Sequence, residues 1–252
     1  MDSTRKPPEW VSKLAARASS ADVERITKSI LAAVDHVSSS RWDAAVQRAA
    51  DLPGDVRPEK IKALTDSFSR ELAALGATAG AAAVAPAVGT VATMAAAAAE
   101  LAWFTTRAGD LILTIAALHG RSAPGVEERR AWVMAVLVYG GSAREGFAAA
   151  LNQANTGLDV ATHNPVPVAT LQTVNRIMSR LILRRYGTRR GAVALGTALP
   201  LGIGAVVGGS ANYMAVRALA RHANEFFIRL PYSSIETTAT EAPPGLRSGP
   251  IN

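Results

Sequence analysis

Two long stretches of this chain carry no charged residue, and a single proline interrupts each of them. The first runs from Leu72 to Ala99 around Pro86, and the second runs from Gly191 to Val216 around Pro200. A straight helix of about 20 residues crosses a bilayer, so either stretch is long enough. Proline, however, removes a backbone hydrogen bond and kinks or breaks a helix, and the halves beside Pro86 would each rise only about 20 Å. The sequence therefore predicts two bent apolar hairpins, rich in alanine and glycine.

The rest of the chain predicts an all-α fold. Apolar residues recur at spacings of three and four, as in Ile26, Ile30, Val34 and Val37, and no run alternates in the manner of a strand. We expect one helical bundle domain over residues 1–235, followed by a disordered tail over 236–252 that is rich in proline, glycine, serine and threonine. Each half of the domain has an amphipathic helix before its hairpin, which indicates a weak twofold repeat.

Local signals predict several helix boundaries. Ser20 is suited to cap a helix, and Asp110 is suited to cap a short helix over 111–118 that Gly120 ends. Further helices are expected over 126–139, ended by a pair of glycines, and over 168–186.

The charge is unevenly placed along the chain. The formal net charge is +7, and residues 167–230 contribute nine arginines, no lysine and one acidic residue. Four of these arginines adjoin the second hairpin: Arg184, Arg185, Arg189 and Arg190. Such a group beside an apolar segment indicates contact with an anionic membrane surface or an acidic partner, although a solvated face is the alternative. No aromatic interleaving or recognised module indicates nucleic acid.

The residues supply no catalytic or metal-binding pattern. The chain has no cysteine and four scattered histidines, none of them paired at the spacing that zinc-binding helices use. No glycine-rich stretch has the form of a nucleotide-binding loop, and no apolar core of a secretory signal follows the charged N-terminus. The sequence therefore predicts no catalytic residues, no metal and no cofactor.

Three polar residues lie near the apolar stretches and form a possible buried polar site. They are Glu100, Asp110 and Asn212, with Arg107 and His222 as possible partners. A working site where the hairpins meet is one interpretation. The structural alternative, which we adopt, is that Asp110 caps a helix and Asn212 satisfies a carbonyl left by Pro200. Glu100 would then pair with Arg107 or reach solvent.

Two blocks of residues resemble the EcsC family. The first is Gly109 to Leu113 followed by Ala116 to Gly120, with His119 where an aromatic residue is expected. The second combines 199–205, Asn212-Tyr213 and 223–227. The resemblance covers about residues 55–230. It implies a bacterial, helical, membrane-associated protein, linked through gene neighbourhood to a transporter, with no established reaction and no catalytic residues to transfer.

Three functional hypotheses follow from these features. The first is an EcsC-like accessory or regulatory factor that acts through a lipid or a membrane protein, such as a transporter. It would be peripheral or monotopic on the cytoplasmic side. The second is a cytoplasmic helical protein that binds a hydrophobic ligand between its hairpins. The third and weakest is a hydrolase that uses the acidic and polar residues. The sequence leaves the oligomeric state open.

Overall fold

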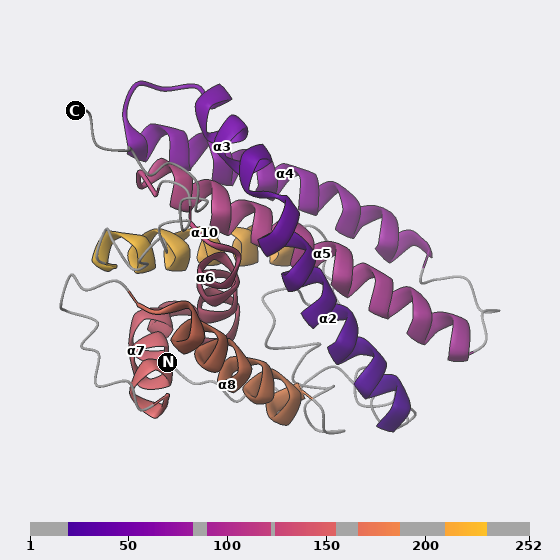
Figure 1. Cartoon of the computed structure of the whole chain (residues 1–252). Helices are drawn as coiled ribbons and strands as arrows, with labels where there is room; N and C mark the ends of the chain where they lie inside the picture. The colour runs from indigo at the N-terminus through magenta and orange to yellow at the C-terminus, as the bar shows by residue number, and fades with distance from the viewer. Residues whose placement is uncertain (1–19, 83–89, 122–123, 155–165, 187–209, 231–252) are drawn as a thin grey trace, which may run out of the picture.

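The chain forms a bundle of helices, as the sequence predicts. The computed structural model describes residues 20–82, 90–121, 124–154, 166–186 and 210–230, and within these ranges it contains no strand (Figure 1). The α-helices are α2 (Ser20–Ser40), α3 (Trp42–Asp51), α4 (Arg57–Ala82), α5 (Thr90–Leu118), α6 (Val126–Tyr139), α7 (Ala143–Gln153), α8 (Val168–Tyr186) and α10 (Ser210–Arg229). A 3-10 turn, η1 (Gly140–Ser142), joins α6 to α7.

Two helices form the centre of the bundle. α5 packs against α2, α3, α4 and α10, and α6 packs against α2, α7 and α8 (Figure 1). Residues 131–136 of α6 are all buried, which explains why this stretch of the helix has no polar face. The buried apolar side chains form one cluster that extends from Ile26 to Leu230, so the described helices share a single core.

Aromatic side chains fasten α6 to its neighbours. The ring of Trp132 lies 6.5 Å from that of Trp42 on α3 and 5.3 Å from that of Phe227 on α10. The contact with Phe227 is edge to face, an arrangement that aromatic quadrupoles favour. Helices that are distant in the sequence therefore meet at one buried tryptophan.

Most of the expected helix boundaries are confirmed. α2 begins at Ser20 and buries its predicted apolar stripe, and α6 and α8 have the predicted bounds. Gly120 ends α5 with a φ of 73°. The backbone amides of Gly120 and Arg121 donate to the carbonyls of Ala117 and Ala116 (2.9 and 3.2 Å), the pattern of a helix that closes on a glycine.

The predicted start of a short helix at Asp110 is wrong. α5 runs without a break from Thr90 to Leu118, a length of 29 residues, and Asp110 lies in its interior. An aspartate caps a helix when its carboxylate bonds to nearby backbone amides. Here two arginine side chains donate hydrogen bonds to the carboxylate, so its oxygens have partners without any backbone amide.

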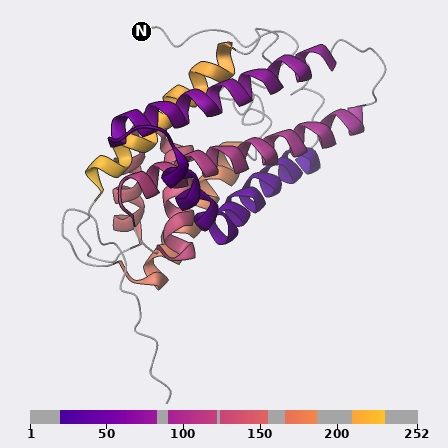
Figure 2. The same ribbon diagram turned by 90° about the horizontal axis from the view of Figure 1, so that it is seen from above.

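The first apolar stretch is divided between two helices. Its beginning, Leu72 to Ala82, completes α4, and its end, Thr90 to Ala99, opens α5. The C-terminal end of α4 and the N-terminal end of α5 lie at the same end of the molecule (Figures 1 and 2). We call this part of α4 and α5 the apolar end. The predicted break at Pro86 lies outside the described residues.

The second apolar stretch is described only from Ser210 onward, as the first turns of α10. Pro200, the comparison between the two halves of the predicted repeat and the expected tail over 236–252 all lie outside the described residues.

One described helix is long and apolar enough to cross a membrane. It is the part of α5 from Leu101 to Leu118, and 67% of that window is buried inside the bundle. A helix that forms the core of a soluble protein has the same character, so its length and composition do not by themselves indicate a span.

Candidate functional site

Asp110 is at the centre of a buried ionic cluster. Its side chain is fully buried, and each carboxylate oxygen accepts a hydrogen bond from Arg41: Nε donates to Oδ1 at 2.8 Å and the terminal Nη2 donates to Oδ2 at 2.7 Å. Arg107, one turn before Asp110 on α5, also donates to Oδ2 at 3.0 Å. The hydrogen bond to the carboxylate raises the pKa of Arg41 above its usual value. The cluster therefore holds the carboxylate of Asp110 between two arginines.

Arg107 connects this cluster to α4. It forms an ion pair with Glu71, and its guanidinium lies 4.6 Å from the ring centroid of Phe68. Arg48 of α3 approaches the same ring at 5.7 Å and donates to the hydroxyl of Thr114 at 3.0 Å. Burial lowers the pKa of Arg48. The ionic cluster, which we define as Arg41, Arg48, Glu71, Arg107 and Asp110, thus ties α3 and α4 to α5, and Arg41 ties in the end of α2.

A glycine brings Arg41 to Asp110. A Cβ atom added to Gly109 would lie 2.6 Å from Cγ1 of Val37, closer than real carbon atoms come. Gly109 therefore lets α2 pack directly on the backbone of α5. Arg41 follows α2 immediately, in the one-residue break before α3, and so reaches the carboxylate of Asp110.

The ionic cluster is not arranged for catalysis. Both oxygens of Asp110 already accept charge-assisted hydrogen bonds and its side chain is fully buried, so the carboxylate offers no free approach for a substrate. In the described part of the chain, no group of three histidine or acidic side chains could hold a metal ion. A buried carboxylate with two arginine partners is instead suited to fix how helices pack.

The other members of the predicted polar site are only partly described. Glu100 lies in α5 and Asn212 in α10, but their side chains are outside the described part of the structure. His222 lies instead beside η1, where a Cβ atom on Gly140 would be 3.3 Å from its Nδ1. Arg107 does join Asp110, as the sequence suggested, and its second carboxylate partner is Glu71.

The predicted arginine group extends from the end of α8. Arg184 and Arg185 belong to its last turn with undescribed side chains, and Arg189 and Arg190 lie outside the described residues. The preceding turns show how the helix is oriented. Leu171, Val174 and Met178 are buried against the bundle, whereas Arg176 and Arg180 are exposed. The basic and apolar faces of α8 are thus separated as predicted.

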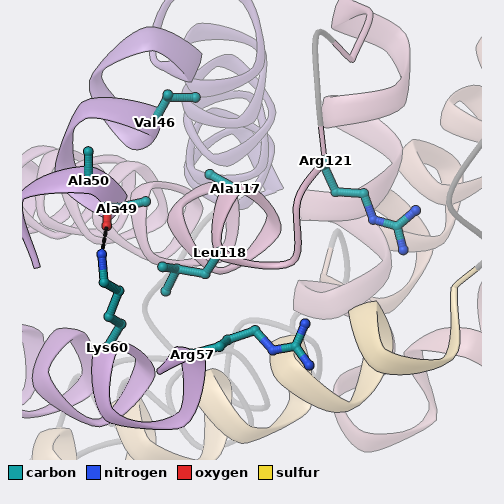
Figure 3. A pocket seen from close by; sticks show the side chains of 8 residues that line it. All are labelled: Val46, Ala49, Ala50, Arg57, Lys60, Ala117, Leu118 and Arg121. Atoms are coloured by element: carbon teal, nitrogen blue, oxygen red, sulfur yellow. Dashed lines mark hydrogen bonds between the residues drawn. The ribbon is translucent and has the colours of Figure 1, made fainter. Parts of the chain in front are cut away.

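An open pocket lies at the opposite end of α4 and α5 from the apolar end. Its volume is about 370 Å³, and α3 lines it with Val46, Ala49 and Ala50 (Figure 3). α5 contributes Ala117 and Leu118 from its last turn. These small apolar side chains form a wall that the sequence analysis did not anticipate.

The remaining lining residues are all cations. Arg57 and Lys60 come from the first turn of α4 and Arg121 follows α5, and no acidic side chain is among the lining residues (Figure 3). Lys60 donates to the carbonyl of Ala49 at 3.4 Å. Arg121 is buried and donates to the carbonyls of Phe227 and Leu230 (3.2 and 2.6 Å) near the end of α10. We call Arg57, Lys60 and Arg121 with the apolar wall the cationic pocket.

The charge of this pocket acts on a buried histidine next to it. His119 bonds through Nε2 to Oδ1 of Asn224 at 2.8 Å, and its ring lies against that of Phe227. Burial lowers the pKa of His119, and Arg57 and Arg121 lower it further, although the bond to Asn224 acts in the other direction. The region around the pocket is therefore electropositive.

Sequence reasoning missed most of these residues because their partners are far apart in the chain. Arg41 precedes Asp110 by 69 residues, and Arg121 contacts carbonyls 106 and 109 residues later. One signal was visible: Arg57 and Lys60 stand in the first turn of a helix, where acidic residues are the usual choice.

Comparison with known proteins identifies no relative. Searches of protein-family models, curated proteins and solved structures return no significant match to this chain. The resemblance to the EcsC family therefore stays a prediction. In the structure, the two blocks that carry this resemblance meet, because His119 of the first block bonds to Asn224 of the second.

Proposed function

We propose that the chain is an EcsC-like accessory factor that attaches to the cytoplasmic face of a membrane through its apolar end. The observation that carries the proposal is that α4 and α5 both extend beyond the described core as uncharged helical segments. α4 continues from the buried Leu72 to Ala82, about 15 Å of helix without a charge. That length matches half of a hydrocarbon core of about 30 Å, so the end would enter one leaflet and not cross.

The one described helix that is both long and apolar enough to cross a membrane supports attachment at the surface over a span. Most of the window from Leu101 to Leu118 is buried in the bundle. Arg107 and Asp110 lie in the middle of it and are paired within the protein. Removing this helix from the bundle would break the ionic cluster and expose the core.

Trp103 stands where an interfacial residue is needed. It lies one turn after Ala99 on α5 and is 40% exposed, whereas Trp42 and Trp132 are buried. Tryptophan favours the headgroup region because its ring is apolar and its N–H is polar. On binding to vesicles, the fluorescence of the protein should shift to shorter wavelength, and Trp103→Phe should remove most of that shift.

The test is flotation of the full chain with phosphatidylcholine vesicles, with and without phosphatidylglycerol. The protein should float with the anionic vesicles at low salt. We expect a variant with glutamine at Arg184, Arg185, Arg189 and Arg190 to bind at least about tenfold more weakly, because each arginine near an anionic surface contributes about 1 kcal/mol.

A matched variant controls for net charge. It carries glutamine at four exposed basic residues of other helices: Lys28, Lys62, Arg70 and Arg229. It should float as the wild type does. Failure of the wild type to float with either vesicle would reject the membrane proposal, and equal loss in both variants would reject the arginine site.

A further inference from the structure

We infer that the cationic pocket binds a small soluble organic anion, best matched by a phosphate monoester with a short apolar body. The first reason is its composition. An exposed cationic side chain, Arg57, and a half-buried one, Lys60, line a pocket with no acidic lining residue. Among the described residues, Arg57 has no hydrogen bond or ion pair, and the bond from Lys60 to a carbonyl is long at 3.4 Å.

The second reason is that this placement of charge opposes the stability of the fold. The N-terminus of a helix carries a partial positive charge, which disfavours cations in the first turn. α4 nevertheless places Arg57 and Lys60 there, and its first-turn acid, Glu59, accepts a hydrogen bond from the backbone of Asp55. Residues that break a local rule without a compensating contact are expected at binding sites.

The third reason is the field at His119. Because Arg57 and Arg121 both act on this histidine, their positive charges converge on one region of the protein. A bound anion would offset that charge, and the amide end of α4 would add to its attraction.

The volume and the lining of the pocket also restrict the size and chemistry of the ligand. A volume of about 370 Å³ lies at the small end of ligand sites, and the wall of alanine, valine and leucine suits a few methylene groups. Arginine and lysine together bind phosphate well, since one offers a planar fork and the other a mobile point charge. Arg57 begins α4, about 38 Å along the helix from Ala82, so the pocket faces away from a membrane that holds the apolar end.

The experiment is a titration of the isotope-labelled full chain, followed through its backbone amide NMR signals. Three probes are compared. Butyl phosphate carries both the charge and the apolar body, inorganic phosphate carries the charge alone, and 1-butanol carries the apolar body alone. Butyl phosphate should cause saturable shifts at Ala49, Ala117 and Leu118 and bind at least fivefold more tightly than inorganic phosphate, by an estimate of about 1 kcal/mol for the apolar body. Butanol should cause no saturable shift.

Variants assign the binding to the pocket. Arg57→Gln and Lys60→Gln should each weaken butyl phosphate by about tenfold, the effect of losing a charge-assisted hydrogen bond. Lys62→Gln removes an exposed charge from the same helix and should leave binding unchanged. Arg121 is left intact because it also holds the end of α10.

The proposal is overturned if butyl phosphate gives no saturable shift, if the shifts lie elsewhere or if Lys62→Gln weakens binding as much as the pocket variants do. Equal affinity for inorganic phosphate and butyl phosphate would overturn its apolar part. The double variant Arg57→Gln/Lys60→Gln should still float with anionic vesicles, which separates this site from membrane attachment. Loss of flotation together with loss of butyl phosphate binding would overturn the assignment to a soluble ligand and favour a lipid phosphate.

Discussion

Two groups of cations lie along α5, and they differ in whether carboxylates pair with them. In the ionic cluster, Arg41 and Arg107 are held by the buried carboxylate of Asp110, and Arg107 also pairs with Glu71. In the cationic pocket, at the end of the same helix, Arg57 and Lys60 face an open volume without any acidic lining residue.

The difference shows what each group contributes. A buried ion pair is costly to desolvate but very costly to break, so it fixes the packing of the helices that carry its members. Arg57 has no ion pair among the described residues and Lys60 makes only one long hydrogen bond, so these two cations contribute little to packing, and we propose that a ligand explains their presence. Changes in the ionic cluster should therefore alter stability, and changes in the cationic pocket should alter binding.

The largest effect is expected from Asp110→Asn. The amide has nearly the same shape but cannot compensate the two arginines, so the free energy of unfolding should fall by about 3–5 kcal/mol. Urea unfolding measures it, with Asp66→Asn as the matched control because Asp66 pairs with Lys62 at the surface and should contribute far less. An unchanged midpoint for Asp110→Asn would show that the ionic cluster does not organise the fold.

A smaller loss is expected from Gly109→Ala. The new methyl group would meet Val37 at 2.6 Å and push α2 away from α5, which typically costs about 1–3 kcal/mol. Because alanine also favours a helix by about 1 kcal/mol over glycine, the net loss should lie at the lower end. In a Val37→Ala background the loss should shrink or change sign. A stabilised single variant would contradict the close helix contact.

Local sequence signals predicted the helices well but the ionic cluster poorly. The apolar stripe of α2 and the glycine after α5 act over a few residues, so their outcome can be read from the chain. The role of Asp110 depends on Arg41, which lies 69 residues earlier, and a pattern suited to a helix cap gave the wrong boundary. The pocket likewise combines α3, α4 and α5, which only the tertiary structure brings together.

The burial of His119, with a smaller effect of Arg57 and Arg121 on its pKa, should also make stability depend on pH. Its pKa in the folded protein is lowered from 6.5, so below about pH 7 the unfolded chain binds the proton more readily. The stability that the neutral ring contributes is present above pH 6.5, and it is lost as the pH falls toward the pKa of His119 in the folded protein. His119→Gln should flatten the fall of the melting temperature between pH 7.5 and 5, a range chosen about the reference pKa.

His222 has a pKa lowered mainly by burial as well, so part of the pH dependence should remain in the His119→Gln variant. A direct measurement is an NMR titration of His119 in Arg57→Gln. Because the positive charge of Arg57 is removed, the pKa of His119 should rise. A value unchanged from the wild type would show that Arg57 does not act on the histidine and would weaken the contrast with the ionic cluster.

The smallest effect is expected from Arg57→Gln and Lys60→Gln on stability itself, and its sign is opposite to that of Asp110→Asn. Each substitution removes a cation from the positive end of α4, so the free energy of unfolding should stay the same or rise by about 0.3–1 kcal/mol. The gain should shrink at high salt, since screening weakens exposed charges. Urea unfolding at low and high salt measures both. A clear loss of stability in either variant would mean that these cations hold the helices together, and the two groups along α5 would then serve the same purpose.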